Sequence, residues 1–358
     1  MTTDIAVTDI AVIGFAQSAN ERHSASTTNG VELLVPLFQE VLADTGLDRR
    51  DIGFWCSGSS DYLAGRAFSF VSAVDAIGAF PPITESHVEM DGAWALYEAY
   101  VKLLIGEADT AIAYGFGKSS AGDLRRILAL QLDPYLAAPL WPDSVGIAGL
   151  QARQCLDAGL CTEREMAEVA ARSRARAMAD PRAQLAGDVT ADELLAQPYL
   201  ADPLRAHDCA PISDGAAAVV LARGDVARRH CRRPAWITGF AHRVDPGVLG
   251  LRDLTRSPSA VAAAADAGLD PASLDVAELH APFTHQELLL TRELGLGEQV
   301  QVNPSGGVLA GNPMFSAGLA RIGTAARHIM SGRADRAAGH ATSGPALQQN
   351  LFCVMGAE

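Results

Sequence analysis

Two carboxylates stand at the start of a strongly apolar stretch, within the segment Val88–Gly92. The run that follows, Ala93–Ile105, is apolar except for two charged side chains, which predicts a helix buried on most sides. Because a helix N-terminus offers unpaired N–H groups and the positive end of a dipole, acidic groups are favoured there. Glu89 and Asp91 are therefore candidate acid–base groups. The alternative for Asp91 is a helix N-cap without a chemical role.

Composition and charge limit the classes of protein that this chain can belong to. Its 358 residues are 49% hydrophobic, enough for a large core, and its net charge of −14 argues against nucleic-acid or anionic-membrane binding. The six cysteines form no CxxC pair, so neither a metal site nor a disulfide framework is indicated. With no signal-peptide pattern and no apolar stretch of membrane-spanning length, we expect a cytoplasmic protein.

Three motifs occur twice, in the same order and at nearly constant separation. They are Ile10–Ala16 with Ala235–Ala241, Ala43–Asp48 with Ala265–Asp270, and Ile105–Asp109 with Ser331–Asp335. This register predicts a duplicated α/β unit in two halves, 1–232 and 233–358, each reading strand, helix, strand, helix, strand. The helix after Gly92 and the one around Gly318–Met330 would be equivalent and would lie between two sheets.

An insertion from about 118 to 205 interrupts the first half. Helical patterns cover 149–158, 162–178 and 191–196, and two capping boxes, Thr162 with Glu165 and Thr190 with Glu193, begin the later ones. We interpret the insertion as a lid over a pocket. The half then closes with Asp214–Leu221, which predicts a tight turn into a buried strand.

Three further segments carry a resemblance to the thiolase superfamily, and within it to the lipid-transfer or sterol-carrier type. Asp208–Leu221 resembles the segment that closes the first half, Asn303–Pro313 resembles the NPSGG…GHP loop, and His280–Phe283 stands where this type has HDxF. The resemblance implies the thiolase fold, a five-layered α/β/α/β/α arrangement with a helical loop domain.

The departures from the thiolase pattern concern the reacting groups. Glu89 occupies the position of the nucleophilic cysteine, and Asn312 replaces the histidine of the GHP loop. The second catalytic cysteine would fall in His340–Ser343, which contains none. Because a thiolate must attack the thioester and later leave, a glutamate cannot take its place, and acyl transfer by the usual route is not expected.

Other roles are open to these residues. Glu89, partly desolvated, would be an acid or base, with burial raising its pKa and the helix N-terminus lowering it. His280 would donate to a developing enolate, unless it is simply a satisfied core histidine. His340 would be a second proton carrier, with a structural role as the alternative. Asn312 keeps hydrogen-bonding ability without a titrating group.

Substrate contacts are expected from four residues: Gly306, Gly307, Ser343 and Phe283. Because glycine has no side chain, these two residues allow the backbone to pass close to a neighbouring group, which is either the substrate or a loop of a partner protein. The basic residues of the insertion are candidates for the phosphates of coenzyme A, but the sequence does not choose among them.

A base, an enolate-stabilising donor and a coenzyme A pocket without a nucleophile suit retro-aldol cleavage of a 3-hydroxyacyl-coenzyme A. The closing segment Ser343–Asn350 resembles a branch that includes aldolases of steroid side-chain degradation, which implies a small zinc-ribbon/OB-fold partner and a possible heterotetramer built on a homodimer. Coenzyme A would be part of the substrate, and no bound cofactor is expected. The alternatives are an acetyl-coenzyme A acyltransferase and a non-catalytic lipid-carrier or scaffold subunit.

Overall fold

The structure, a computed structural model, describes residues 9–25, 30–61 and 68–358. Strands of the first half are β1 (Ile10–Gln17), β2 (Phe54–Gly58), β3 (Glu85–Val88), β4 (Thr110–Lys118) and β7 (Ile212–Arg223). Those of the second half are β8 (Ala235–Val244), β9 (Val276–Glu278), β10 (Gln301–Val302), β12 (Arg336–Ser343) and β13 (Gln349–Gly356). The short β11 (Asn312–Pro313) pairs with β7.

Strand order shows the duplication directly. The first half runs β3-β2-β4-β7-β1 and the second runs β10-β9-β12-β13-β8, so each strand has a counterpart in the other half. The two half-sheets meet where β1 pairs antiparallel with β8, at Ala11 opposite Trp236. The first pair of repeated motifs lies in the equivalent strands β1 and β8, and the other two pairs lie at the ends of equivalent helices. The proposed boundary at 232/233 lies in the connection between α9 and β8.

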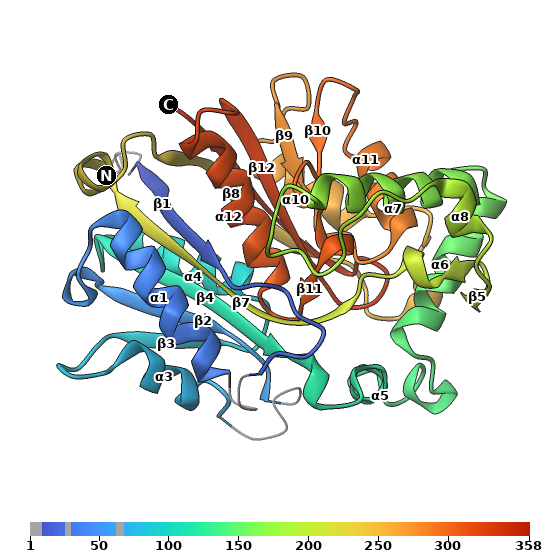
Figure 1. Cartoon of the computed structure of the whole chain (residues 1–358), viewed down its shortest axis with the longest axis horizontal. Coiled ribbons are helices and arrows are strands. Elements are labelled where there is room, and N and C mark those ends of the chain that lie inside the picture. Colours follow the sequence, from blue (N-terminus) through green and yellow to red (C-terminus); the bar gives the residue numbers. More distant parts are fainter. Residues whose placement is uncertain (1–8, 26–29, 62–67) are drawn as a thin grey trace, which may run out of the picture.

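Helices cover both faces of each half-sheet (Figure 1). They are α1 (Val31–Thr45), α3 (Val71–Ile77), α4 (Gly92–Leu104), α9 (Gly224–His230), α10 (Pro258–Asp266), α11 (Thr284–Glu293) and α12 (Ala317–Met330). Leu96 of α4 and Ile322 of α12 share one buried cluster with strands of both halves. Leu34 of α1 and Leu290 of α11 belong to separate clusters on the outer faces. The predicted five layers are confirmed, with α4 and α12 in the middle.

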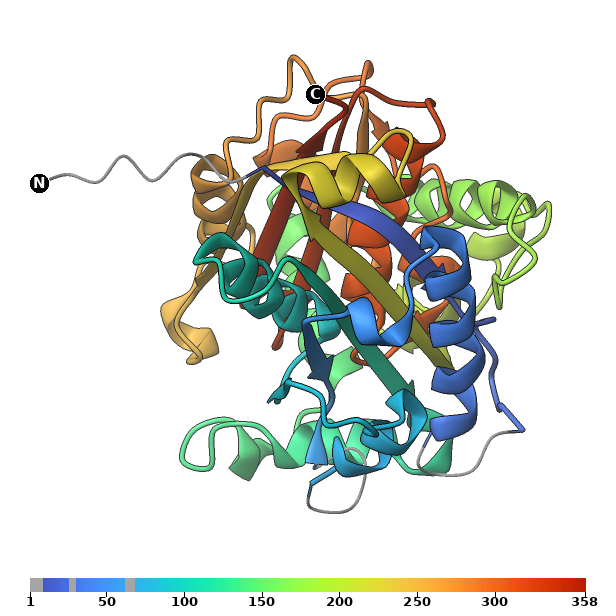
Figure 2. The same cartoon turned by 90° about the vertical axis from the view of Figure 1, so that its left-hand side faces the viewer.

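The insertion is helical, as expected. It contains α5 (Leu124–Leu130), α6 (Ser144–Asp157), α7 (Glu163–Ala177), α8 (Ala191–Leu195) and a hairpin of β5 (Tyr199–Ala201) and β6 (Leu204–Arg205). Both capping boxes are present, at Thr162 and Thr190. In both views α5 lies at the lower edge of the molecule, apart from α7 (Figures 1 and 2).

One prediction for this region is wrong. Asp214 does not lie in a tight turn but within β7, where its buried carboxylate accepts the backbone N–H groups of Ser24 and Ser120 at 2.9 Å each. The Asp-Gly pair suggested a turn, yet the sheet and these backbone donors hold the aspartate extended.

In the described part of the chain, no helix combines the length and apolarity needed to cross a membrane.

Candidate active site

A cavity of about 860 Å³ lies at the carboxyl ends of the parallel strands. Glu89 follows β3, His280 follows β9, and Ser343 ends β12, so strands of both halves bring these residues to one place. Residues of the insertion complete the wall. Six of the residues expected at the site line the cavity: Glu89, Asp91, His280, Phe283, Asn312 and Ser343. Gly306, Gly307 and His340 do not belong to this lining.

Asp91 joins the two central helices. Its carboxylate accepts the N–H of Ala93 at 2.9 Å, which caps α4, and the N–H groups of Gly318 and Leu319 at 3.1 and 2.9 Å, in the first turn of α12. The side chain is buried, which raises its pKa, while the three N–H bonds act in the opposite direction. A Cβ at Gly318 would lie 2.7 Å from Oδ1, so only glycine permits this approach. Asp91 is therefore the N-cap of α4, as one of its two interpretations predicted.

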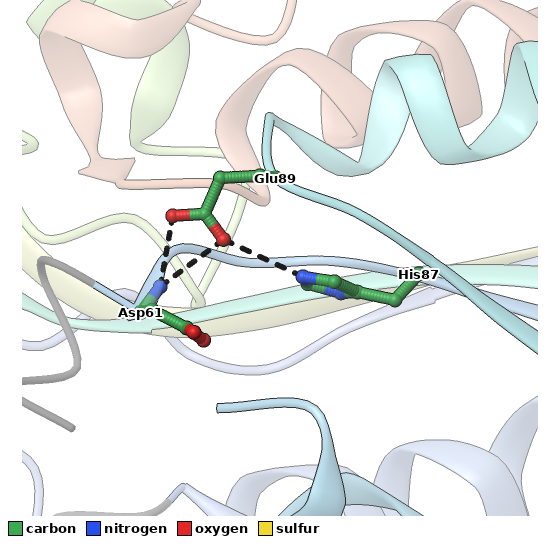
Figure 3. A group of neighbouring side chains, drawn as sticks. All are labelled: Asp61, His87 and Glu89. Atoms are coloured by element: carbon green, nitrogen blue, oxygen red, sulfur yellow. Dashed lines mark hydrogen bonds and ion pairs between the residues drawn. The ribbon is translucent and has the colours of Figure 1, made fainter. Parts of the chain in front are cut away.

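Glu89 has the opposite environment. Its side chain is 52% exposed, and both carboxylate oxygens accept the backbone N–H of Asp61, at 2.9 and 3.2 Å (Figure 3). His87 Nε2 lies 3.5 Å from Oε2, and His87 Nδ1 lies 3.1 Å from Ser57 Oγ. The carboxylate is therefore held in place at the cavity wall yet remains open to solvent.

The side chains of Asp61, His87 and Glu89 lie close enough to suggest a metal site, since their ligand atoms are within 4.8 Å of one another. The Asp61 oxygens, however, already accept the N–H groups of Phe68 and Ser69, at 2.8 and 2.7 Å. These internal bonds account for the arrangement, which carries no independent sign of an ion.

His280 is buried at the cavity, and its Nδ1 accepts the N–H of Thr342 at 3.4 Å, which places the ring proton on Nε2. Burial is the main cause that lowers the pKa of His280 to about 3; the positive charge of Arg321 acts in the same direction, and the nearby Asn312 side chain opposes them. The imidazole is therefore neutral at physiological pH, with an N–H to donate. The backbone N–H of Asn312 donates to Ser213 Oγ at 2.9 Å, which fixes this loop against β7.

The structure does not bring His340 to the cavity. Its Nε2 lies 2.9 Å from Asn350 Oδ1, and its ring stacks on Phe352 with centroids 4.5 Å apart. The Asn350 amide nitrogen donates to Ser259 Oγ and to the carbonyl of Leu347, so Oδ1 is left to accept the histidine proton. His340 is thus a packed core residue, and the alternative structural reading fits its surroundings.

The glycine pair is also placed differently from the expectation. A Cβ at Gly306, where φ is +94°, would lie 2.8 Å from the carbonyl oxygen of Ser173 in α7, and one at Gly307 would meet Asn303. The close approach that these glycines permit is therefore to the insertion and to their own loop. Behind the loop, buried Glu278 pairs with Arg321 at 2.8 Å and accepts from Ser305 Oγ at 2.7 Å.

Sequence reasoning missed several cavity residues. Thr342 orients His280 through its backbone, a role that no side-chain pattern reveals. His207 and Gln286 both line the cavity and are 4% and 2% exposed. His207 directly precedes the segment Asp208–Leu221, and Gln286 follows His280–Phe283 by three residues, so proximity to these motifs was the available signal.

The chain is similar in sequence and in fold to several known proteins. An acetyl-CoA acetyltransferase of Methanothermobacter thermautotrophicus is 28% identical over 344 residues, covering 87% of this chain and 88% of that protein. Sterol carrier protein 2 of Gallus gallus is 25% identical over 386 residues, covering 95% and 69%. A solved structure described as an Ltp2-ChsH2(DUF35) aldolase superposes with a TM-score of 0.80 at 19% identity, covering 98% of each chain. These similarities extend over most of the chain, and the superposition shows the thiolase fold. No family model matches the chain.

The one cysteine in the cavity lining is Cys209. Burial, together with the negative charge of Asp208, raises the pKa of the Cys209 thiol to about 12. Such a thiol is protonated at physiological pH and does not act as a thiolate nucleophile. The cavity instead has a carboxylate from Glu89, a neutral imidazole from His280 and an amide from Asn312.

Proposed function

We propose that the chain is a thiolase-like enzyme acting on acyl-coenzyme A thioesters, and that its reaction is retro-aldol cleavage of a 3-hydroxyacyl-coenzyme A. The observation that carries the proposal is the set of groups at the cavity: the accessible carboxylate of Glu89 and the neutral N–H of His280, with no thiol able to ionise. These groups supply proton transfer and oxyanion stabilisation, which are what a retro-aldol reaction requires.

In the proposed reaction Glu89 takes the proton of the β-hydroxyl group. The electrons of that O–H bond form the new carbonyl, the Cα–Cβ bond breaks, and its electron pair moves into the thioester as an enolate. Glu89 then returns the proton to Cα. The products are an aldehyde or ketone and a shortened acyl-coenzyme A, and the protein ends in its starting protonation state, so no oxidant or co-substrate is consumed.

His280 supports the enolate step in two ways. Because Nδ1 accepts the Thr342 N–H, Nε2 carries the proton and serves as a donor. Because burial keeps the ring neutral, it stabilises the enolate oxygen by a hydrogen bond without giving up its proton. The Asn312 amide nitrogen is the second donor in the proposal. No step needs a metal or a cofactor.

Acetyl transfer is the second candidate, favoured by the 28% identity to an acetyl-CoA acetyltransferase. That reaction would need a nucleophile at the reacting centre, and Glu89 stands where the superfamily resemblance places the cysteine. A non-catalytic acyl-coenzyme A carrier is the third. We rank the lyase first because the carboxylate and the neutral imidazole lie at one cavity.

Assembly belongs to the proposal too. We infer a homodimer through β3, which ends the sheet of the described residues. An edge strand of this kind leaves backbone groups free to pair with a second copy. A small zinc-ribbon/OB-fold partner is proposed because the superposed neighbour is described as an Ltp2-ChsH2(DUF35) aldolase.

The test is turnover of 3-hydroxyacyl-coenzyme A thioesters with branched or steroid tails, with and without such a partner. Formation of an aldehyde or ketone in step with a shortened acyl-coenzyme A supports the lyase. Saturable binding without product in both arms selects the carrier, and acetyl transfer from acetyl-coenzyme A selects the acyltransferase.

A further inference from the structure

Asn303 does not belong to the cavity lining, yet it holds the backbone that leads to His280. Its side chain is buried, and its Oδ1 accepts the N–H of Leu279 at 2.6 Å. The N–H of Asn303 itself donates to the carbonyl of Ala277 at 2.8 Å. One residue thus bonds to the chain on both sides of Glu278, where β9 ends.

The sheet stops before it reaches His280. The pairing of β9 with β12 ends at Glu278, and its pairing with β10 ends one residue earlier, so Asn303 takes the place of a strand for the Leu279 N–H. The bond from the Thr342 N–H to His280 Nδ1 is 3.4 Å long, near the upper limit for a hydrogen bond. A small shift of the Leu279 backbone would therefore break it.

Glu287 of α11 sets the orientation of the Asn303 amide. Asn303 Nδ2 donates to Glu287 Oε2 at 2.6 Å, and a carboxylate paired with an arginine only accepts. The amide must therefore present its nitrogen to Glu287 and its oxygen to the Leu279 N–H. Arg172 of α7 pairs with the other carboxylate oxygen of Glu287 at 2.5 Å. Three contacts thus link the insertion to the residue before His280.

The backbone at Asn303 suits asparagine and aspartate. Its φ is +47°, in the left-handed region, where these two residue types are tolerated better than most other non-glycine residues. A Cβ at Gly307 would lie 2.9 Å from Asn303 Nδ2, so this glycine leaves room for the amide. The loop geometry is therefore built around the side chain of Asn303, and Asn303→Asp is a substitution that its backbone accepts.

We propose that Asn303 is a positioning residue for His280, and that Glu287 orients it for this task. By holding the Leu279 N–H, Asn303 keeps the His280 ring at the Thr342 N–H, so that the ring proton stays on Nε2. This inference rests on the proposed function, in which that proton is donated to the enolate. The state of the ring, however, can be measured without turnover.

Exchange of the amide and the carboxylate tests the network. Asn303→Asp alone sets two carboxylates against each other, and Glu287→Gln alone gives the introduced amide two donors to face, Asn303 Nδ2 and Arg172. In the double variant every contact has a donor and an acceptor again. The introduced amide donates to the introduced carboxylate and accepts from Arg172, and the second carboxylate oxygen accepts the Leu279 N–H.

Two readouts are taken on the full chain. Steady-state kinetics with a 3-hydroxyacyl-coenzyme A separate kcat from KM, and ¹⁵N NMR of histidine-labelled protein reports the tautomer of His280, whose signals are identified by their loss in His280→Ala. The matched control is Glu293→Gln, which breaks an ion pair with Arg256 near the other end of α11. Its side chain is 9% exposed, and thermal melting shows whether each variant is folded.

We expect each single variant to lower kcat about ten- to a hundredfold with a much smaller change in KM, because the donor is misplaced while the cavity is intact. The His280 ring should change from one neutral form, protonated on Nε2, to a mixture of tautomers. The double variant and Glu293→Gln should resemble the natural chain in both readouts. A folded double variant that is no better than the single variants would overturn the proposal.

The readouts also separate this inference from the proposed reaction. If the natural chain does not cleave the substrate, the lyase proposal fails, and the ring signals alone decide whether Asn303 positions His280. If the natural chain cleaves it and the single variants keep both kcat and the ring signals, the positioning role is wrong and the lyase stands. Losses confined to thermal melting would likewise reduce Asn303 to a residue of the fold.

Discussion

Glu89 and Asp91 stand two residues apart and differ in almost every physical respect. Asp91 is buried and accepts three backbone N–H groups from two helices, whereas Glu89 is half exposed and accepts one backbone N–H. The comparison teaches that a carboxylate saturated by backbone donors is part of the fold. One with spare acceptor capacity at a cavity is available for chemistry.

His280 and His340 repeat this contrast. Both are buried and neutral, but His280 lines the cavity while His340 is stacked on Phe352 and bonded to Asn350. In each pair, one side chain is bonded within the protein interior and the other is available at the cavity. Four substitutions test whether the first kind of residue serves stability and the second serves turnover.

The largest effect is expected for Glu89→Gln. Removal of the proposed base should lower turnover of a 3-hydroxyacyl-coenzyme A by about 10²- to 10⁴-fold, with little change in stability because the side chain is half exposed. Steady-state kinetics and thermal melting measure the two quantities. Glu98→Gln, on the exposed face of α4, should leave both unchanged. Equal turnover in the two variants would rule out Glu89 as the base.

His280→Ala should follow, with turnover reduced by about 10²- to 10³-fold through loss of one oxyanion donor. The expected change is in kcat more than in KM, because the donor acts on charge that develops during the reaction. A loss confined to KM would instead assign His280 to ground-state binding.

Asp91→Ala should reverse the pattern of Glu89→Gln. It removes an N-cap worth about 1 kcal/mol and leaves two further buried N–H groups unpaired, so we expect a loss of about 3 kcal/mol in the free energy of unfolding. Urea unfolding measures it, and Asp91→Asn, which keeps one acceptor, should lose less. A destabilisation no greater than that of Glu89→Gln would contradict the structural assignment.

The smallest effect on turnover near neutral pH is expected for His340→Gln. Burial lowers the pKa of His340 from 6.5 to about 4, so its contribution to stability is fully present above pH 6.5 and is lost as the pH falls toward 4. The variant should therefore show a shallower loss of unfolding free energy in that range, by about 1.4 kcal/mol per pH unit for one proton. Its turnover at pH 7.5 should stay near that of the natural chain. An unchanged slope, or lost turnover, would contradict this account.

Much of the fold was readable from sequence because it depends on local patterns that the chain repeats. Paired motifs at β1 and β8, and at the ends of α4 and α12, predicted the duplicated halves, and two capping boxes marked insertion helices. The thiolase resemblance grouped Glu89, His280 and Ser343 as site residues. The structure brings them together because residues after parallel strands share one edge of a sheet.

The rest of the site depends on contacts between distant segments. Whether His340 faces the cavity is decided by Phe352 and Asn350 on the next strand, and what Gly306 approaches is decided by Ser173 in the insertion. The orientation of the Gln286 amide is set by Gln151, whose amide nitrogen donates to the carbonyl of Leu254. No periodicity or motif within one segment encodes such pairings.

The most direct test of the central claim is whether cleavage needs free coenzyme A. A 3-hydroxyacyl-coenzyme A is incubated with the protein in ²H₂O without free coenzyme A, with and without the proposed zinc-ribbon/OB-fold partner, and products are followed by mass spectrometry. We predict one shortened acyl-coenzyme A with a single deuterium at Cα and one free aldehyde or ketone. Products that appear only when coenzyme A is added, as two thioesters without a free carbonyl compound, would contradict retro-aldol cleavage.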